Sequence, residues 1–416
     1  MAPPPITDPP MPRPGTGFFA VDESGVVFSE ASQNLYALDP MAAYCWLEIE
    51  AGRPLAGIAD DLAGASGHTP AEALARIRDV IASFAAANLL DDGAPPCPPA
   101  APARPERTVP PPPGLDALLD APARSTHLRL MGYGFRLDFG TAELADALAD
   151  IVAPLTVAAL PFAPPGTPER RLALVEADGV VYGCDQRQTV FSSTEEGSAA
   201  AVLERILYRG ALYQTDCLLS IHCGSVGVGP RDDAGHPAAW LCLPAASGSG
   251  KTTLTAALAA AGFPYGSDEM LVLRDDLTAR PLEFPLCIKA KSWPVLADLY
   301  PELPELSVYE RYGNKVRFLP PPGSRIAPDW RPIAGFVFPR YAADEVTELR
   351  PLDPIAGMQR LFDQCLTIPE PLNLDDVGRI VAFCAGSTFH ELPLSDLGAA
   401  IGAIRDLFPV SKTKPR

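Results

Sequence analysis

One glycine-rich loop between two apolar segments constrains the fold of this chain more than any other feature of its sequence. The apolar run 238–243 leads into the loop 245–253, and the alanine- and leucine-rich segment 254–261 then ends at Gly262. This order predicts a strand, a tight loop and a helix that Gly262 terminates. The sequence therefore indicates an α/β fold around this loop.

The residue types in the loop are those that bind phosphate groups. Gly248 and Gly250 allow successive N–H groups to face phosphate oxygens, and the new helix adds its positive N-terminal end. Lys251 is placed to reach the β- and γ-phosphates, and the Thr252 hydroxyl can bind Mg²⁺. Ala245 stands where the P-loop pattern has its first glycine, and alanine fits there if φ is negative. The sequence predicts ATP and Mg²⁺ as cofactors, with these loop residues at the nucleotide: Ser247, Gly248, Ser249, Gly250, Lys251, Thr252 and Thr253.

Lysine usage supports this interpretation over a chance small-residue turn. The chain has only six lysines against 27 arginines, so a lysine at this loop position is improbable by chance.

Two further polar features flank the loop. Asp268 and Glu269 begin an apolar run, and His222 ends another. A surface Asp-Glu turn and a hydrogen-bonded core histidine are the alternatives for these features.

Composition excludes several classes of function. A net charge of −18 disfavours nonspecific binding to nucleic acid or to an anionic membrane. No apolar run approaches the roughly 20 residues that span a bilayer. The first fifteen residues lack a basic-then-apolar pattern, so we expect a cytoplasmic protein. The nine cysteines include no C-x-x-C pair, which argues against a zinc ribbon or a dithiol site.

Two proline-rich stretches, 2–15 and 94–114, divide the chain. The second should act as a semi-extended tether between folded units. The predicted organisation is a disordered proline-rich start (1–15), a first domain (16–92), a linker (93–115) and a second domain (116–410).

The first domain is predicted to contain three short strands followed by three helices, an order typical of a winged helix. Strands are expected at 18–21, 26–28 and 34–38. The helices are expected at 41–50, after the Asp39-Pro40 start, at 55–63, and after the capping box of Thr69 and Glu72. Residues 1–92 carry four arginines, no lysine and thirteen acidic residues, the wrong sign for a DNA backbone.

The run Asn34–Leu38 followed by Asp39–Trp46 resembles the PqqD-like family of leader-peptide recognition modules. This resemblance covers about residues 16–92. It implies that a precursor peptide docks as an extra strand at the edge Asn34–Leu38, beside the helix Pro70–Ala87.

His222, the loop and Ser267-Asp268-Glu269 together resemble the core of the HPr kinase/phosphorylase family, and more closely its HPr-kinase-like relatives. The resemblance implies a mixed sheet related to phosphoenolpyruvate carboxykinase. It implies that Asp268 is the general base and that His222 assists this base. Glu269 takes a second acidic position, which is aspartate in HPr kinases, and with Thr252 is expected to hold the metal.

Basic residues are locally enriched between 285 and 340, with eight Lys or Arg against five acidic residues. This excess suggests that Lys289, Lys291, Arg317 or Arg340 faces the phosphates. We take Arg317 and Arg340 as the nucleotide-binding candidates. Solvated surface is the alternative for each of the four.

The expected function is an ATP-dependent kinase for a serine or threonine of a ribosomally made precursor peptide. The first domain would hold the leader, and the second would phosphorylate the core. A kinase of a small metabolite or free amino acid, and a nucleotide-gated peptide chaperone without catalysis, are the alternatives. No nucleic-acid or membrane partner is expected, and a homo-oligomer is left open.

Overall fold

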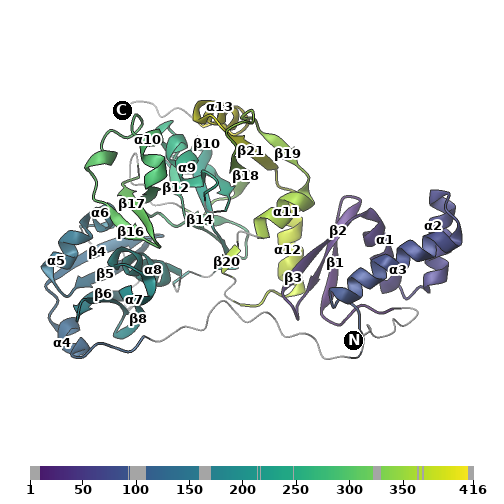
Figure 1. Ribbon diagram of the computed structural model, residues 1–416, viewed down its shortest axis with the longest axis horizontal. Coiled ribbons are helices and arrows are strands. Elements are labelled where there is room, and N and C mark those ends of the chain that lie inside the picture. The colour runs from purple at the N-terminus through teal and green to yellow at the C-terminus, as the bar shows by residue number, and fades with distance from the viewer. Residues whose placement is uncertain are drawn as a thin grey trace. The chain divides into compact units, whose positions relative to one another are not determined.

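The computed structural model of the chain divides into two compact units (Figure 1). It describes residues 10–91, 93, 109–158, 170–212, 214, 215, 217–246, 248–321, 329–362, 365–367 and 370–410. Most of the predicted proline-rich start 1–15, most of the predicted linker 93–115, and Ser247 lie outside these residues. Within the described part of the chain, no helix is long and apolar enough to cross a bilayer.

The N-terminal unit contains the predicted three strands and three helices. The strands form one antiparallel sheet in the order β1-β2-β3. The elements are β1 (Thr16–Val21), β2 (Ser24–Ser29), β3 (Asn34–Leu38), α1 (Pro40–Glu50), α2 (Leu55–Ser66) and α3 (Pro70–Ala86). Both predicted helix starts are confirmed: Asp39 accepts from the N–H of Ala42, and Thr69 and Glu72 form the capping box.

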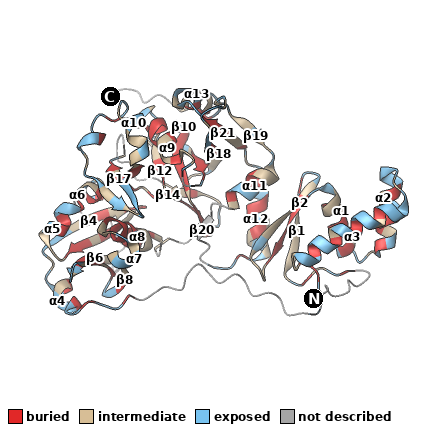
Figure 2. Ribbon diagram, viewed as in Figure 1, coloured by how far each residue is buried: buried red, intermediate tan, exposed pale blue. Residues whose placement is uncertain are grey.

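The core of this unit lies between the sheet and its helices (Figure 2). Trp46 of α1 is fully buried and meets the ring of Phe84 of α3 edge-on, with ring centroids 5.3 Å apart. Ile77 and Ile81 lie one turn apart on α3 and are also fully buried. The apolar face of α3 therefore fills the core.

The larger unit begins with a five-stranded sheet of order β4-β5-β6-β7-β8, in which only β5 and β6 are parallel. Helix α8 (Ala199–Leu212) buries its apolar face in the core beside this sheet. The strands are β4 (Arg124–Leu130), β5 (Tyr133–Phe139), β6 (Arg170–Ala177), β7 (Val180–Asp185) and β8 (Gln188–Ser192). The short helices of this part are α4 (Leu115–Asp120), α5 (Ala142–Ala147), α6 (Ala149–Val152), η1 (Ala153–Leu155) and α7 (Ser193–Glu196).

A six-stranded mixed sheet of order β12-β10-β11-β18-β21-β19 carries the glycine loop. A mixed sheet is what the sequence resemblance implied. Strand β18 is parallel to both β11 and β21. The strands are β10 (Cys223–Arg231), β11 (Pro237–Pro244), β12 (Tyr265–Ser267), β18 (Ile333–Tyr341), β19 (Arg350–Leu352) and β21 (Phe389–Leu394). Helices α9 (Lys251–Ala260) and α13 (Leu397–Leu407) share a core with this sheet.

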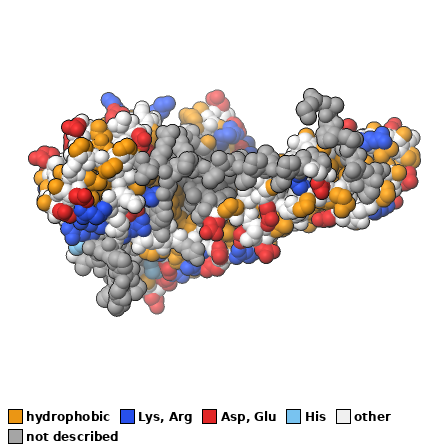
Figure 3. All heavy atoms as spheres, turned by 90° about the horizontal axis from the view of Figure 1, so that it is seen from below, with side chains coloured by type: hydrophobic (Ala, Val, Ile, Leu, Met, Phe, Trp, Pro, Cys, Tyr) orange, Lys and Arg blue, Asp and Glu red, His pale blue; other side chains and the backbone are white. Residues whose placement is uncertain are grey.

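Two smaller sheets complete the larger unit, with orders β14-β13-β9-β20 and β15-β17-β16. Their strands are β9 (Leu219–Ile221), β13 (Leu271–Leu273), β14 (Ala279–Pro281), β15 (Leu286–Lys289), β16 (Tyr309–Arg311), β17 (Asn314–Leu319) and β20 (Cys365–Thr367). The remaining short helices are η2 (Ala290–Ser292), α10 (Trp293–Leu296) and η3 (Leu303–Glu305). Side chains of both signs of charge lie on the face shown in Figure 3.

Two helices from late in the sequence belong to the N-terminal unit. They are α11 (Pro354–Phe362) and α12 (Leu374–Ala385), so this part of the predicted span 116–410 is grouped with the first domain. The Leu374 side chain lies so close over Gly17 of β1 that a Cβ at Gly17 would meet it at 2.7 Å. A three-stranded sheet has two faces, and helix α12 covers part of the one that the first three helices leave open.

Hydrogen bonds from the β2–β3 turn hold the start of α12. The Gln33 side-chain amide donates to the Leu372 carbonyl at 3.0 Å and accepts from the Leu372 N–H at 2.8 Å. Glu30 accepts from the N–H of Leu374 at 2.9 Å. These bonds satisfy backbone groups at a helix start, where the first N–H groups have no partner within the helix.

Replacing Gln33 with alanine should weaken the N-terminal unit, because the paired backbone groups of Leu372 lose their partner. We expect the free energy of unfolding of the full chain to fall by about 1–2 kcal/mol in urea denaturation. The control is Gln186→Ala, at an exposed position in the β7–β8 turn with φ of 57° against 56° for Gln33. An equal loss in the two variants would show that the Leu372 contacts contribute nothing.

Candidate functional site

The glycine loop joins β11 to α9 and curls as the sequence predicts. Gly248 and Gly250 both have φ of 91°, a left-handed conformation that favours glycine. The N–H of Ser249 donates to the Ala246 carbonyl. The Ser249 carbonyl accepts from the N–H of Tyr341 at 3.0 Å. The loop is thus anchored to the end of β18, and α9 begins at Lys251 directly after it.

Lys251 and His222 are in direct contact. The Lys251 side chain is 6% exposed, and its ammonium donates to His222 Nε2. His222 Nδ1 lies 2.8 Å from the backbone carbonyl oxygen of Glu269, so Nδ1 carries the proton and Nε2 accepts. Burial and the Lys251 charge lower the pKa of His222 to about 4, and burial also lowers the pKa of Lys251. His222 is therefore neutral at physiological pH.

Asp268 is fully buried at the end of β12. Its carboxylate accepts from the N–H of Cys287 at 3.1 Å, and the Tyr265 hydroxyl lies 3.1 Å from its other oxygen. Burial, and then the neighbouring charge of Glu269, raise the pKa of Asp268 to about 7. A carboxyl group with this pKa can exchange a proton near neutral pH, which is what a general base needs.

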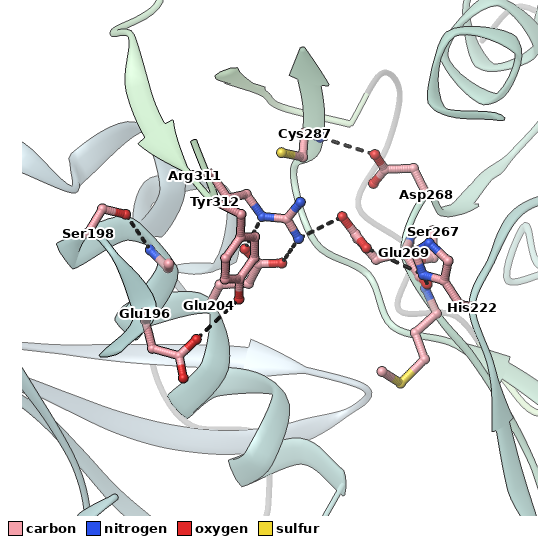
Figure 4. Close-up of polar contacts among 12 residues, drawn as sticks. Glu196, Ser198, Glu204, His222, Ser267, Asp268, Glu269, Cys287, Arg311 and Tyr312 are labelled. Carbon is pink, nitrogen blue, oxygen red and sulfur yellow. Dashed lines mark hydrogen bonds and ion pairs between the residues drawn. The ribbon is translucent and has the colours of Figure 1, made fainter. Parts of the chain in front are cut away.

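Glu269 faces a buried arginine that the sequence analysis did not identify. Arg311, at the end of β16, donates to Glu269 Oε1 at 2.9 Å and makes two hydrogen bonds to Glu204 of α8 (Figure 4). The second oxygen, Oε2, lies 3.6 Å from His222 Nδ1. Arg311 lies 42 residues from Glu269 and 107 from Glu204 in sequence, and no motif marks Arg311 or Glu204.

Three other predicted nucleotide-binding residues, Thr253, Arg317 and Arg340, have different partners in the structure. The Thr253 hydroxyl is 2.7 Å from that of Ser292. The Arg317 guanidinium stacks on the ring of Trp293, 4.2 Å from its centroid. Arg340 is half exposed and forms ion pairs with two glutamates, Glu345 at 2.7 Å and Glu391 at 3.2 Å. Contact of Arg317 and Arg340 with a nucleotide stays a prediction.

Thr252 and Glu269 offer the oxygen ligands that Mg²⁺ prefers, a hydroxyl and a carboxylate. Among the described residues, no group of three or more His, Cys, Asp and Glu is arranged to hold a metal. Mg²⁺ usually takes one or two protein ligands, together with phosphate oxygens and water. The two residues fit that mode, and their role as metal ligands stays a prediction.

The predicted peptide-binding edge is strand β3. In the described part of the chain, β3 pairs with β2 and ends the sheet order on that side. The Tyr36 hydroxyl donates to the Ala87 carbonyl, just beyond α3, at 3.3 Å. A hollow of about 400 Å³ lies between α1 and α3, lined by Met41, Arg76, Asp79, Val80 and Ser83.

Comparison with known proteins identifies the N-terminal module. Residues 24–90 match the family model described as coenzyme PQQ synthesis protein D (PqqD), so this module is PqqD-like. The match covers β2, β3 and the first three helices. Comparison with curated proteins finds no match. One similar solved structure is TbiB1 in complex with the TbiA(beta) leader peptide, at 18% identity and a TM-score of 0.19, covering 20% of this chain and 99% of that one.

The raised pKa of Asp268 has a consequence for stability. Because its value of about 7 in the folded protein exceeds the ordinary 3.8, the folded state binds more protons between about pH 4 and pH 7. The contribution of this group to stability is therefore fully present below pH 4 and lost as the pH rises through 7.

Asp268→Asn removes this ionisation, so the variant should be more stable than wild type at pH 8 and lose that advantage towards pH 4. We expect the Tm at pH 8 to rise by a few degrees. Thermal unfolding at pH 4, 6 and 8 measures it, with Asp146→Asn, at an exposed ion pair with Arg124, as control. A constant Tm difference between variant and wild type across this pH range would contradict the raised pKa of Asp268.

Proposed function

We propose that this chain is an ATP-dependent kinase that phosphorylates a serine or threonine hydroxyl of a ribosomally synthesised precursor peptide. The N-terminal PqqD-like module would bind the leader of that peptide. The observation that carries the proposal is the convergence of Lys251, His222, Asp268 and Glu269 from separate segments beside one glycine loop.

In this proposal each residue has a chemical role. The acceptor hydroxyl oxygen attacks the γ-phosphorus, the bond from that phosphorus to the bridging oxygen breaks, and ADP leaves. The hydroxyl proton passes to ionised Asp268, whose raised pKa suits it to accept. Thr252 and Glu269 would hold Mg²⁺, which supplies positive charge to neutralise the phosphates when it is bound.

Lys251 would change its hydrogen-bond partner when a nucleotide binds. Its ammonium donates to His222 Nε2. A triphosphate is a stronger partner for a buried ammonium than a neutral imidazole, because both partners are then charged. Lys251 would therefore turn to the phosphates, and His222 Nε2 would become free to accept a proton near Asp268.

The PqqD-like module accounts for substrate choice. A leader peptide that adds to β3 as a strand would use main-chain hydrogen bonds for affinity and the hollow beside α3 for selectivity. A bound leader raises the local concentration of its own core peptide near the kinase site. One chain that carries both functions can thus select a precursor and modify it.

Incubation of precursor peptide with ATP and the full chain tests the function directly. Mass spectrometry should show the gain of one phosphate. Asp268→Asn should still bind ATP while transfer falls by about 10²–10⁴-fold, and Lys251→Ala should abolish transfer. Lys315→Ala, at an exposed lysine, is the control and should retain activity. Nucleotide binding without transfer in wild type would favour a peptide chaperone, and transfer to a free amino acid would favour a metabolite kinase.

Tyr36→Pro tests the peptide-binding edge, because proline removes a backbone donor from β3. The apparent KM for full-length precursor should rise, while kinetics on a leaderless peptide at saturating concentration should be nearly unchanged. Both peptides are titrated against wild type and variant. Equal kinetics in all four combinations would reject the leader-binding role, and loss of turnover on both peptides would indicate structural support instead.

A further inference from the structure

An unbroken chain of polar contacts runs from the glycine loop to helix α8. Lys251 donates to His222, and the His222 ring donates to the carbonyl oxygen of Glu269. The carboxylate of Glu269 then accepts from Arg311, which also binds Glu204. Figure 4 shows Arg311 between the two glutamates. Each link joins segments that are far apart in the sequence.

Arg311 and Glu204 are shielded from solvent, with side-chain exposures of 13% and 2%. Burying charges is costly unless each has a partner. The two-pronged contact with Glu204 supplies an opposite charge and engages two of the five N–H groups of the guanidinium. The bond to Glu269 gives Arg311 a second carboxylate partner, and it connects this arginine to the residue whose carbonyl holds His222.

Glu269 contributes two groups to the site, its carboxylate and its backbone carbonyl. Arg311 engages Oε1 and leaves Oε2 on the side of His222. The backbone carbonyl of the same residue fixes the proton of His222 on Nδ1, which keeps Nε2 as the acceptor. A shift of Glu269 would change both the carboxylate position and the orientation of the imidazole.

We propose that Arg311, held in place by Glu204, is a positioning residue that fixes Glu269 and, through the Glu269 carbonyl, the tautomer and orientation of His222. This assignment rests on the proposed kinase function for its effect on turnover. Its effect on His222 does not depend on that function. Arg311 contacts Glu204 and Glu269, so in this proposal both Arg311 and Glu204 act through Glu269.

The main test is the tautomer of His222, read by ¹⁵N NMR of the full-length chain at a single neutral pH. The chain has five histidines, and His222→Asn assigns the signal. Wild type should show a proton on Nδ1 alone. Arg311→Met should give a mixture of tautomers, and Arg311→Lys, which keeps the charge, should restore much of the wild-type signature. Glu204→Gln should loosen Arg311 and shift the signal in the same direction as Arg311→Met.

The matched control is Arg170→Met, which breaks another shielded ion pair, to Asp185, in the same unit. This control should lower the Tm and leave the His222 signature unchanged. In the kinase assay, Arg311→Met should lower kcat by about 10²-fold, the cost of misplacing a catalytic group, while the KM for ATP stays close to wild type.

Three results decide the proposal. An altered His222 signature in Arg311→Met, absent in Arg170→Met, supports it even if wild type transfers no phosphate, in which case only the kinase function fails. A wild-type signature in the folded Arg311→Met and Glu204→Gln variants overturns it. Equal losses of kcat in Arg311→Met and Arg170→Met would also overturn it, since the effect would then come from destabilisation alone.

Discussion

The burial of one ammonium group, that of Lys251, is the constraint on which the site depends. A charged group removed from water needs hydrogen-bond acceptors and opposite charge close by. His222 supplies the acceptor, and Asp268 and Glu269 supply negative charge. The same burial lowers the pKa of His222 and raises that of Asp268, so the groups that stabilise the lysine also gain properties useful for proton transfer.

The site is assembled by three different parts of the larger unit. The six-stranded sheet places the glycine loop and Asp268, the short strand β9 leads into His222, and β15 supplies the Cys287 N–H that holds Asp268. Arg311 and Glu204 connect this arrangement to β16 and α8. Acidic and basic groups are thus held by packed elements, which fixes their geometry before any substrate arrives.

The N-terminal unit shows a second way in which distant segments combine. Its PqqD-like elements are contiguous in sequence, yet α11 and α12 come from beyond residue 350, and α12 packs on β1 of the sheet. The chain leaves α12 and enters β21, which lies beside β18 in the sheet of the glycine loop. The module is therefore linked to the rest of the chain by these late segments as well as by the region 94–108.

Local patterns were enough to predict much of this protein. The three strands, the helix starts at Asp39 and Thr69, and the strand, loop and helix around Lys251 depend on hydrogen bonds and backbone angles within a few residues. The PqqD-like match at residues 24–90 agrees with the resemblance carried by Asn34–Trp46. The candidate roles of His222 and Asp268 came from resemblance, which located the residues without giving their geometry.

Tertiary structure alone decided which groups meet. Arg311 lies 107 residues from Glu204 and 42 from Glu269, and an isolated arginine or glutamate carries no local signal of a buried partner. The docking of α12 on β1 likewise depends on a sheet face left open by elements at the start of the chain, and the hydrogen bonds at the start of α12 span 339 to 344 residues. The sequence by itself determined the local elements and the residue types at the loop. Burial and long-range pairing, which only the folded chain establishes, decided the charges, the tautomer of His222 and the membership of the two units.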